Sequence, residues 1–238
     1  MAEPTQDAVI VRVRDVTPRV REMVLLPSAQ TISFVPGQWI SLKLPVGERP
    51  PLNRAYTMAE PETPSGELVL AFDRVHQGLG SEYLYSLKPA DRVTLSGPYG
   101  NFILPDPPTD DVVMIARYTG VVPFRCMLRR ITAHPLSRSI TLILVSQSLS
   151  ELPYHEEFLE LAERVPTFRY ESLLPVIPAV SREDAEIQST LDLWNALFRD
   201  RRDVMPMICG TKAFVRPIRE QLRKLGFDRR NVRVETYD

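Results

Sequence analysis

A short segment with the sequence LNRAYTMAE, residues 52–60, carries side chains suited to phosphate and aromatic recognition. Alternation along an extended strand places Arg54 and Tyr56 on one face and Thr57 on the other, unless the strand bends. A guanidinium pairs with phosphate and a ring stacks on a flat heterocycle, so this spacing favours a flat, anionic ligand. A solvated Arg beside a half-buried Tyr is the alternative interpretation.

The segment HQGLGSEYLYSLK, residues 76–88, has the composition of a phosphate-binding helix start. Gly78 and Gly80 allow close backbone approach, and Ser81 is suited to cap a helix over residues 81–88. Free N–H groups and the positive end of the helix dipole would then face an anion. A plain capped helix explains the same residues without a ligand.

The stretch IARYTGVVPFRCMLRR, residues 115–130, is typical of a buried strand that turns into a helix. Thr119 and Gly120 suit a turn that holds a phosphate, but Arg117 and Tyr118 fill the places where such turns prefer small residues. These residues alone leave open whether the turn still holds a nucleotide.

The elements that must position these segments differ between the two halves of the chain. Short β-rich runs separated by Pro and Gly turns extend from about residue 8 to 103, which is the pattern of an antiparallel barrel or sandwich. From residue 112 onward strands alternate with helical patterns, which predicts a parallel sheet. The sequence therefore predicts an N-terminal antiparallel β-barrel followed by an α/β domain with a parallel sheet, joined by the Pro-rich linker 104–111.

Composition and charge narrow the functional classes. The 238 residues are 44% hydrophobic and 25% charged, enough for two small domains, and a net charge of −1 gives no support for nucleic acid as a partner. Cys126 and Cys209 are too few for a four-thiolate iron–sulfur cluster, and they fit a reducing, cytoplasmic compartment. The three histidines are scattered, so no metal site is expected, and no leader or membrane-spanning run is evident.

The order of several motifs resembles the ferredoxin–NADP reductase superfamily of flavoproteins. The resemblance extends from about Val9 to Tyr237 and rests on the segments FVPGQW, RAYT, GLGSEYL, GPYGNF, TGVVPFRCMLR, ICGTKAF and VETY. It implies that residues 1–105 form an FAD-binding β-barrel domain and that residues 111–238 form an NAD(P)-binding α/β domain.

The resemblance also assigns residues to the flavin. It implies that Arg54 pairs with the pyrophosphate, and that Ala55 and Tyr56 line the site, with Tyr56 against the isoalloxazine ring. Thr57 would place its hydroxyl near flavin N5. Gly80 and Ser81 would offer hydrogen-bond donors to the pyrophosphate.

In the second domain, the resemblance places Thr119 and Gly120 at the nicotinamide dinucleotide and Cys209 beside the nicotinamide. The family most often has Gly where Tyr118 stands, which is the largest departure. We hypothesise that the flavin site is intact and that dinucleotide binding is weakened or rearranged, with Arg117 supplying charge to the pyrophosphate and Tyr118 packing at the domain interface. Glu235 and Tyr237 match an acid near the flavin and a terminal aromatic on its exposed face. Cys209 as a small residue ending a buried strand, and the C-terminus as a frayed end, are the alternatives.

The choice between NADPH and NADH stays open. Ser181 and Arg182 resemble the pair with which the plant-type branch reads the 2′-phosphate, which favours NADPH as substrate. However, the SRED segment is also typical of a helix start, with Ser181 as the cap and Arg182 in solvent.

The expected function is that of a flavoprotein oxidoreductase. It would pass electrons from NAD(P)H through bound FAD to a one-electron acceptor such as ferredoxin, flavodoxin or another redox protein, with Thr57, Cys209, Glu235 and Tyr237 at the reacting groups. We expect a monomer that needs neither nucleic acid nor membrane. The alternative is a flavin-binding electron-transfer or regulatory subunit with impaired nicotinamide binding.

Overall fold

The computed structural model describes residues 5–47, 50–175 and 181–237. The chain divides into two compact units. The first comprises Met1–Leu104 together with Val122–Arg130, and the second comprises Pro105–Val121 together with Ile131–Asp238. The division thus falls within the predicted linker, but the first unit also takes up a helical segment that the sequence reasoning had assigned to the second.

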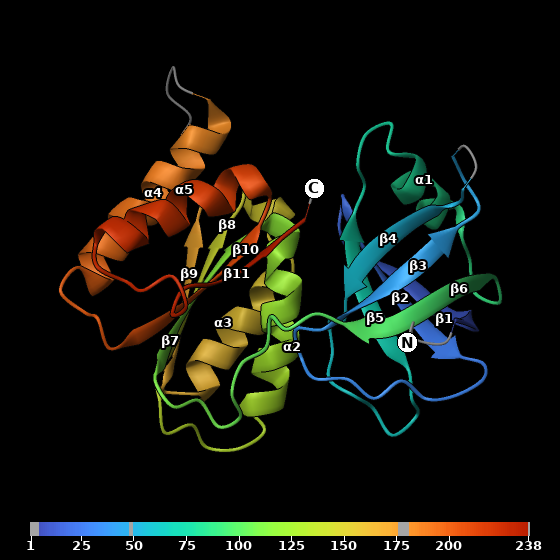
Figure 1. Cartoon of the computed structure of the whole chain (residues 1–238), viewed down its shortest axis with the longest axis horizontal. Helices are drawn as coiled ribbons and strands as arrows, with labels where there is room; N and C mark the ends of the chain where they lie inside the picture. Colours follow the sequence, from blue (N-terminus) through green and yellow to red (C-terminus); the bar gives the residue numbers. More distant parts are fainter. Residues whose placement is uncertain (1–4, 48–49, 176–180, 238) are drawn as a thin grey trace. The chain divides into compact units, whose positions relative to one another are not determined.

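The first unit is built on a six-stranded antiparallel sheet, as predicted. Figure 1 shows its strands together with the short helix α1 (Leu79–Ser86). The strands follow the spatial order β4-β3-β6-β1-β2-β5. Their bounds are β1 (Gln6–Thr17), β2 (Val20–Pro27), β3 (Trp39–Leu44), β4 (Leu52–Thr57), β5 (Leu68–Asp73) and β6 (Arg92–Tyr99).

The two edges of this sheet approach each other, which gives it a barrel form. Met58, directly after β4, forms an antiparallel bridge with Leu70 of β5, and the Ala59 N–H donates to Val69 O at 2.6 Å. Every second residue of β3 is buried, because successive side chains of a strand point to opposite faces. These inward side chains join a core of fully buried aliphatic residues that includes Ile40, Leu42, Met23 and Leu70.

Helix α2 (Val121–Ile131) contributes most of its length to the first unit. The backbone of Gly37 has φ +102°, and a Cβ there would come within 2.6 Å of Met127 Cε, so this turn requires glycine. Phe124 of the helix packs against Phe102 with ring centroids 5.6 Å apart. The fully buried guanidinium of Arg125 donates to Ala59 O at 2.9 Å and to the Glu60 carboxylate at 3.1 Å.

The second unit is built on a five-stranded parallel sheet with the order β11-β10-β7-β8-β9. Its strands are β7 (Asp111–Arg117), β8 (Ile140–Val145), β9 (Phe168–Leu173), β10 (Val204–Gly210) and β11 (Arg233–Thr236). All residues of β8 and β10 are buried, as expected for strands covered on both faces. The observed fold class confirms the predicted one.

The chain reverses its direction of travel across this sheet at β7. Strands β8 and β9 follow β7 on one side, whereas β10 returns to the other side and β11 lies beyond it. In an open parallel sheet, ligands bind at the carboxyl ends of the strands beside such a reversal. The carboxyl ends of β7 and β10 are therefore the place where the fold itself predicts a ligand.

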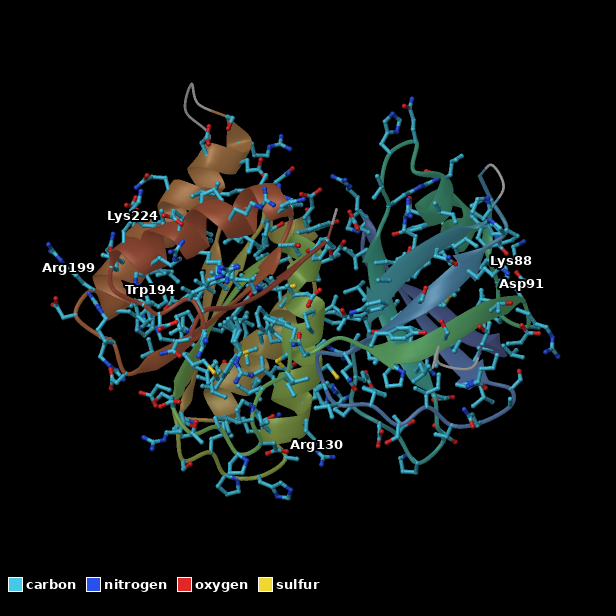
Figure 2. All side chains as sticks on the ribbon, in the orientation of Figure 1. Lys88, Asp91, Arg130, Trp194, Arg199 and Lys224 are labelled. Atoms are coloured by element: carbon cyan, nitrogen blue, oxygen red, sulfur yellow. The ribbon has the colours of Figure 1, made fainter. Side chains whose placement is uncertain are left out.

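Three further helices complete the second unit: α3 (His155–Arg164), α4 (Arg182–Phe198) and α5 (Lys212–Lys224). Figure 1 shows α4 and α5 side by side against the sheet. Trp194 of α4, labelled in Figure 2, is fully buried and packs against Phe198 and Phe227 at 5.2 and 5.5 Å. Within the described ranges, no helix combines the length and apolar character needed to cross a membrane.

Candidate functional site

The pairing of β3 with β4 fixes the orientation of the residues that the resemblance assigns to the flavin. Arg54 lies opposite Leu42 and Tyr56 opposite Ile40, whereas Thr57 lies opposite Trp39. Because directly paired residues share a face, Arg54 and Tyr56 lie on the face that bears the core residues and Thr57 on the other. The predicted alternation is confirmed.

Tyr56 is held by the barrel interior. Its ring centroid lies 5.5 Å from that of Phe72. Burial raises the pKa of its hydroxyl to about 12, although the positive charge of Arg54 acts to lower this pKa. The phenol is therefore neutral at physiological pH. Arg54 itself is exposed, with Nη1 donating to Asn53 O at 3.0 Å, so its guanidinium is accessible to a ligand.

The start of helix α1 differs from the sequence prediction. Gly78, not Ser81, occupies the N-cap position, and Ser81 lies buried inside the first turn. The Ser81 hydroxyl lies 3.1 Å from Val75 O and 3.2 Å from Gly78 O, and it accepts the Val75 N–H at 3.1 Å. The prediction of Ser81 as the cap is wrong because the chain folds back through Val75 and the hydroxyl fastens this turn.

Gly80 brings the helix start against the strand that carries Arg54. A Cβ at Gly80 would lie 3.1 Å from Leu44 Cδ1, 3.2 Å from Leu52 Cδ2 and 3.7 Å from Arg54 Cγ. The N-terminus of α1 therefore lies beside the side-chain stem of Arg54, and both a helix N-terminus and a guanidinium attract anions. These residues fit the pyrophosphate of FAD.

Thr57 lies in a row of side chains that the sequence reasoning did not identify. Trp39 pairs with Thr57 on one side and with Tyr99 on the other, and the two rings lie 4.8 Å apart. Gly100 permits this packing, since a Cβ there would come within 2.7 Å of Trp39 Nε1. The half-buried ring of Trp39 therefore flanks the threonine.

In the second unit, the turn after β7 lies against the end of β10. Ala116 pairs with Cys209, and a Cβ at Gly120 would lie only 2.3 Å from Cys209 O. No other residue type fits at Gly120 without displacing the backbone of β10. The structure thus brings Thr119, Gly120 and Cys209 together at the reversal point of the sheet.

Tyr118 adopts the conformation that a glycine would favour. Its φ is +51°, in the left-handed region, at the first position of a 3-10 turn over Tyr118–Gly120. The turn therefore has a backbone shape typical of glycine, although a bulky residue stands there.

Arg117 is engaged within the protein. Its Nε donates to Glu186 Oε2 at 2.5 Å, and the Glu186 side chain is only 2% exposed. This ion pair argues against the hypothesis that Arg117 supplies charge to a pyrophosphate, since a buried carboxylate already neutralises it.

The C-terminal residues lie beside the same turn. Glu235 pairs with Cys209 across β10 and β11, and burial raises the pKa of its carboxyl group. Burial also raises the pKa of the Cys209 thiol well above its ordinary value, an effect that the Glu235 charge reinforces. Tyr237 donates its hydroxyl proton to Arg117 O at 3.0 Å and accepts the Thr119 hydroxyl at 3.2 Å. Its side chain thus reaches from the end of β11 to the turn after β7.

Ser181 and Arg182 lie at the start of α4. Ser181 is the N-cap: its hydroxyl accepts the Asp184 N–H at 3.2 Å and donates to the Asp184 carboxylate at 2.5 Å. Arg182 is exposed. The capping interpretation of this segment is confirmed, and the role of the pair toward a 2′-phosphate stays a prediction.

Sequence reasoning missed Glu186 as a partner of the turn. It considered only Ser181 and Arg182 at the start of this helix and assigned no role to the acid that follows. Within the observed helix, Glu186, Thr190 and Trp194 follow one another at intervals of four residues and are all buried. The signal available in the sequence was a glutamate on the same helical face as Thr190 and Trp194, a position where an acid is unusual.

The family model described as "Oxidoreductase FAD-binding domain" matches residues 8–103. Ferredoxin–NADP reductase B of Sorangium cellulosum is 33% identical over 100% of this chain and 99% of its own length. The reductase component DmpP of the phenol 2-monooxygenase of Pseudomonas is 29% identical over 79% of this chain but only 52% of its own length.

Solved structures show the same fold. The Amycolatopsis cytochrome P450 reductase GcoB superposes with a TM-score of 0.78 and 24% identity, covering 99% of this chain and 71% of that one. The ferredoxin–NADP reductase of Plasmodium falciparum gives a TM-score of 0.79 at 17% identity, covering 98% and 96%.

The first unit carries an anion cradle, formed by Arg54 and the N-terminus of α1, and the second carries a glycine turn at the reversal of the parallel sheet. This is the arrangement of a two-domain flavoprotein oxidoreductase. The chain belongs to the ferredoxin–NADP reductase superfamily. Membership confirms the expected FAD cofactor and NAD(P)H electron donor, with electrons passing from the donor to redox partners.

Proposed function

We propose that this protein is a ferredoxin–NAD(P) reductase that delivers electrons one at a time to a separate small redox protein, such as ferredoxin or flavodoxin. The observation that carries the proposal is the turn at Thr119 and Gly120, packed on Cys209 where the parallel sheet reverses. The whole-length similarity to a ferredoxin–NADP reductase supports it.

In this proposal residues 1–105 bind FAD, which when bound supplies the hydride-accepting and single-electron chemistry. Arg54 and the backbone of Gly80 bind the pyrophosphate, and the neutral phenol of Tyr56 packs against the ring system. Ala55 lines the site. Ser81 acts by fastening the turn that precedes the helix.

Thr57 is proposed to place its hydroxyl beside the reacting nitrogen of the flavin. Strand alternation sets the face on which Thr57 lies, and its cross-strand neighbour Trp39 is packed against Tyr99 on that face. The contribution expected from these residues is alignment of the reactants.

Residues 111–238 are proposed to bind the dinucleotide, with Thr119 and Gly120 at the pyrophosphate and Cys209 beside the nicotinamide. Cys209 stays a neutral thiol because of its burial, so it shapes the pocket and does not act as a nucleophile. Glu235, whose pKa is raised by burial, is suited to hold a proton near the reacting groups. Tyr237 must release the Arg117 carbonyl and the Thr119 hydroxyl when the nicotinamide enters.

For the nucleotide, we propose NADPH as the preferred donor, read by Arg182. Arg182 is exposed at the start of α4, and the relative of similar length is named as an NADP enzyme. Ser181 would have to exchange its bond to Asp184 for one to the phosphate. NADH is the competing donor. The proposal includes a monomeric, cytoplasmic enzyme, which the two free, buried cysteines fit.

Anaerobic stopped-flow reduction of the FAD-loaded protein tests this function. NADPH, NADH and dithionite are mixed with it separately while flavin absorbance is followed. We expect NADPH to bleach the flavin at a lower concentration than NADH does, and Arg182→Ala to reduce that preference.

Gly120→Ala supplies the matched variant for the same experiment. The added methyl group must displace the backbone at Cys209, so reduction by NAD(P)H should slow by about tenfold or more, whereas dithionite should reduce the flavin as before.

Reduction of the unchanged protein by dithionite and by neither nucleotide would favour the alternative, an electron-transfer subunit with impaired nicotinamide binding. That alternative is suggested by Tyr118 at the turn and Tyr237 across it. A protein that takes up no FAD would contradict both.

A further inference from the structure

The turn at Tyr118 needs support that a glycine turn would not need. A residue with a side chain rarely adopts φ +51°, so contacts on either side must hold the backbone there. On the C-terminal side, Gly120 is fitted against Cys209 O. On the N-terminal side, the side chain of Arg117 extends to helix α4.

The contact at Arg117 is a buried ion pair between elements far apart in sequence. Arg117 Nε lies 2.5 Å from Glu186 Oε2, and the two side chains are 20% and 2% exposed. Glu186 is fixed within the second turn of α4, where its carbonyl accepts the Thr190 hydroxyl at 2.7 Å. A buried carboxylate is costly unless it is paired, so Glu186 constrains Arg117 to a single position.

We propose that Glu186 is a positioning residue for nicotinamide dinucleotide binding. By holding the guanidinium of Arg117, it fixes the strand end from which the Tyr118–Gly120 turn departs, and so keeps the turn in the shape that receives the dinucleotide. This inference rests on the proposed function, since it names the support of the proposed dinucleotide site. It also makes Arg117 a structural residue and not a ligand of the pyrophosphate.

The test is Glu186→Gln in the FAD-loaded full-length protein. The anaerobic stopped-flow rate of flavin reduction is measured over a range of NADPH and NADH concentrations. We expect the half-saturating concentration to rise by about tenfold while the limiting rate changes by less than about twofold, because the turn is displaced but the bound reactants still align. Dithionite reduction and FAD content should match those of the unchanged protein.

Glu22→Gln is the matched control. Glu22 is also a buried carboxylate paired with an arginine, Arg14 at 2.7 Å, but it lies in the first unit on β2. A general loss of stability would affect both variants alike, whereas the proposal predicts a raised half-saturating concentration for Glu186→Gln alone. The double variant Arg117→Gln with Glu186→Gln should bind NAD(P)H at least as well as Glu186→Gln, because no unpaired buried charge remains.

Distinct outcomes overturn the inference. If Arg117 were a phosphate ligand held back by Glu186, then Glu186→Gln would lower the half-saturating concentration and the double variant would raise it. An unchanged value, or one equal to that of Glu22→Gln, also refutes the role. If Glu186→Gln does not fold, Glu186→Asp gives the same reading, since retracting the carboxylate should still raise the half-saturating concentration. Failure of the unchanged protein to be reduced by either nucleotide would instead contradict the proposed function itself.

Discussion

At the scale of single residues, Tyr118 combines a backbone conformation typical of glycine with a bulky side chain. Its left-handed backbone costs about 1–2 kcal/mol relative to an allowed region, and neighbouring contacts must offset that cost. The turn therefore has the handedness that glycine would give. What distinguishes this chain is the phenol ring beside a turn that is proposed to hold a dinucleotide.

Replacing Tyr118 by Gly should tighten NAD(P)H binding. The substitution keeps φ accessible, removes the ring and opens the backbone N–H groups to the ligand, so we expect a several-fold lower half-saturating concentration in stopped-flow flavin reduction. Tyr154→Gly is the control, because Tyr154 also has positive φ, at +60°, but caps helix α3. An unchanged or poorer apparent affinity in Tyr118→Gly would refute the hypothesis that the ring weakens binding.

At the scale of elements, the short helix α1 depends on the loop that leads into it. Three backbone groups of Val75 and Gly78 bond to the buried hydroxyl of Ser81, and this arrangement fixes where the first turn of the helix presents its N–H groups. Beyond the far end of the helix, the Lys88 N–H donates to the Asp91 carboxylate at 2.8 Å in the turn that leads to β6 (both residues are labelled in Figure 2). The anion cradle is therefore set by the loop as much as by the helix.

Ser81→Ala should weaken FAD binding. Loss of the hydroxyl removes the acceptor of the Val75 N–H and the side-chain bond between this loop and the first turn of α1, at a cost of about 0.5–1.5 kcal/mol, and lets the cradle shift. Titration of the apoprotein with FAD measures the effect. Ser86→Ala removes a hydroxyl from the same helix at an exposed position, where it bonds Tyr83 O, and should bind FAD normally. Equal affinities for the two variants would contradict the role of Ser81.

At the scale of the whole molecule, helix α2 belongs to a different unit from the turn that precedes it. The helix follows directly from the turn at Gly120, yet Val122–Arg130 belong to the barrel unit and contribute Cys126 to its core. Arg125 is the polar contact of this packing, with its buried guanidinium on Ala59 O and Glu60. The stability of the FAD-binding unit therefore depends on a helix that lies outside residues 1–105.

Arg125→Met should destabilise the barrel unit. It leaves the Ala59 carbonyl and the Glu60 carboxylate without this donor, so we expect the free energy of unfolding to fall by on the order of 2 kcal/mol. The thermal midpoint, followed by the rise in FAD fluorescence as the flavin is released, should fall with it. Arg130→Met is the control, since Arg130, labelled in Figure 2, is exposed on the same helix. A thermal midpoint equal to that of the control would show that the helix does not depend on this contact.

Much of the fold could be predicted because its signals are local. Alternation in WISLKL and the run ITLILV predict a half-buried and a fully buried strand, and both strands form as expected. The same alternation predicted correctly that Arg54 and Tyr56 share a face. The strand-to-helix pattern placed α2 in the second domain, whereas the structure groups Val122–Arg130 with the first unit, through contacts that no local pattern reveals.

The sequence by itself determined the order of elements, the barrel followed by a parallel sheet, and the positions of Thr119 and Gly120 at a strand-to-helix turn, because hydrophobic period and glycine chemistry act within a few residues. Only the tertiary structure decided that Arg117 belongs to Glu186, 69 residues away, and that Tyr237 reaches the turn after β7. Those contacts exist because β10 and β11 return to the far side of β7, and the order of strands in a sheet is set by packing of the whole chain.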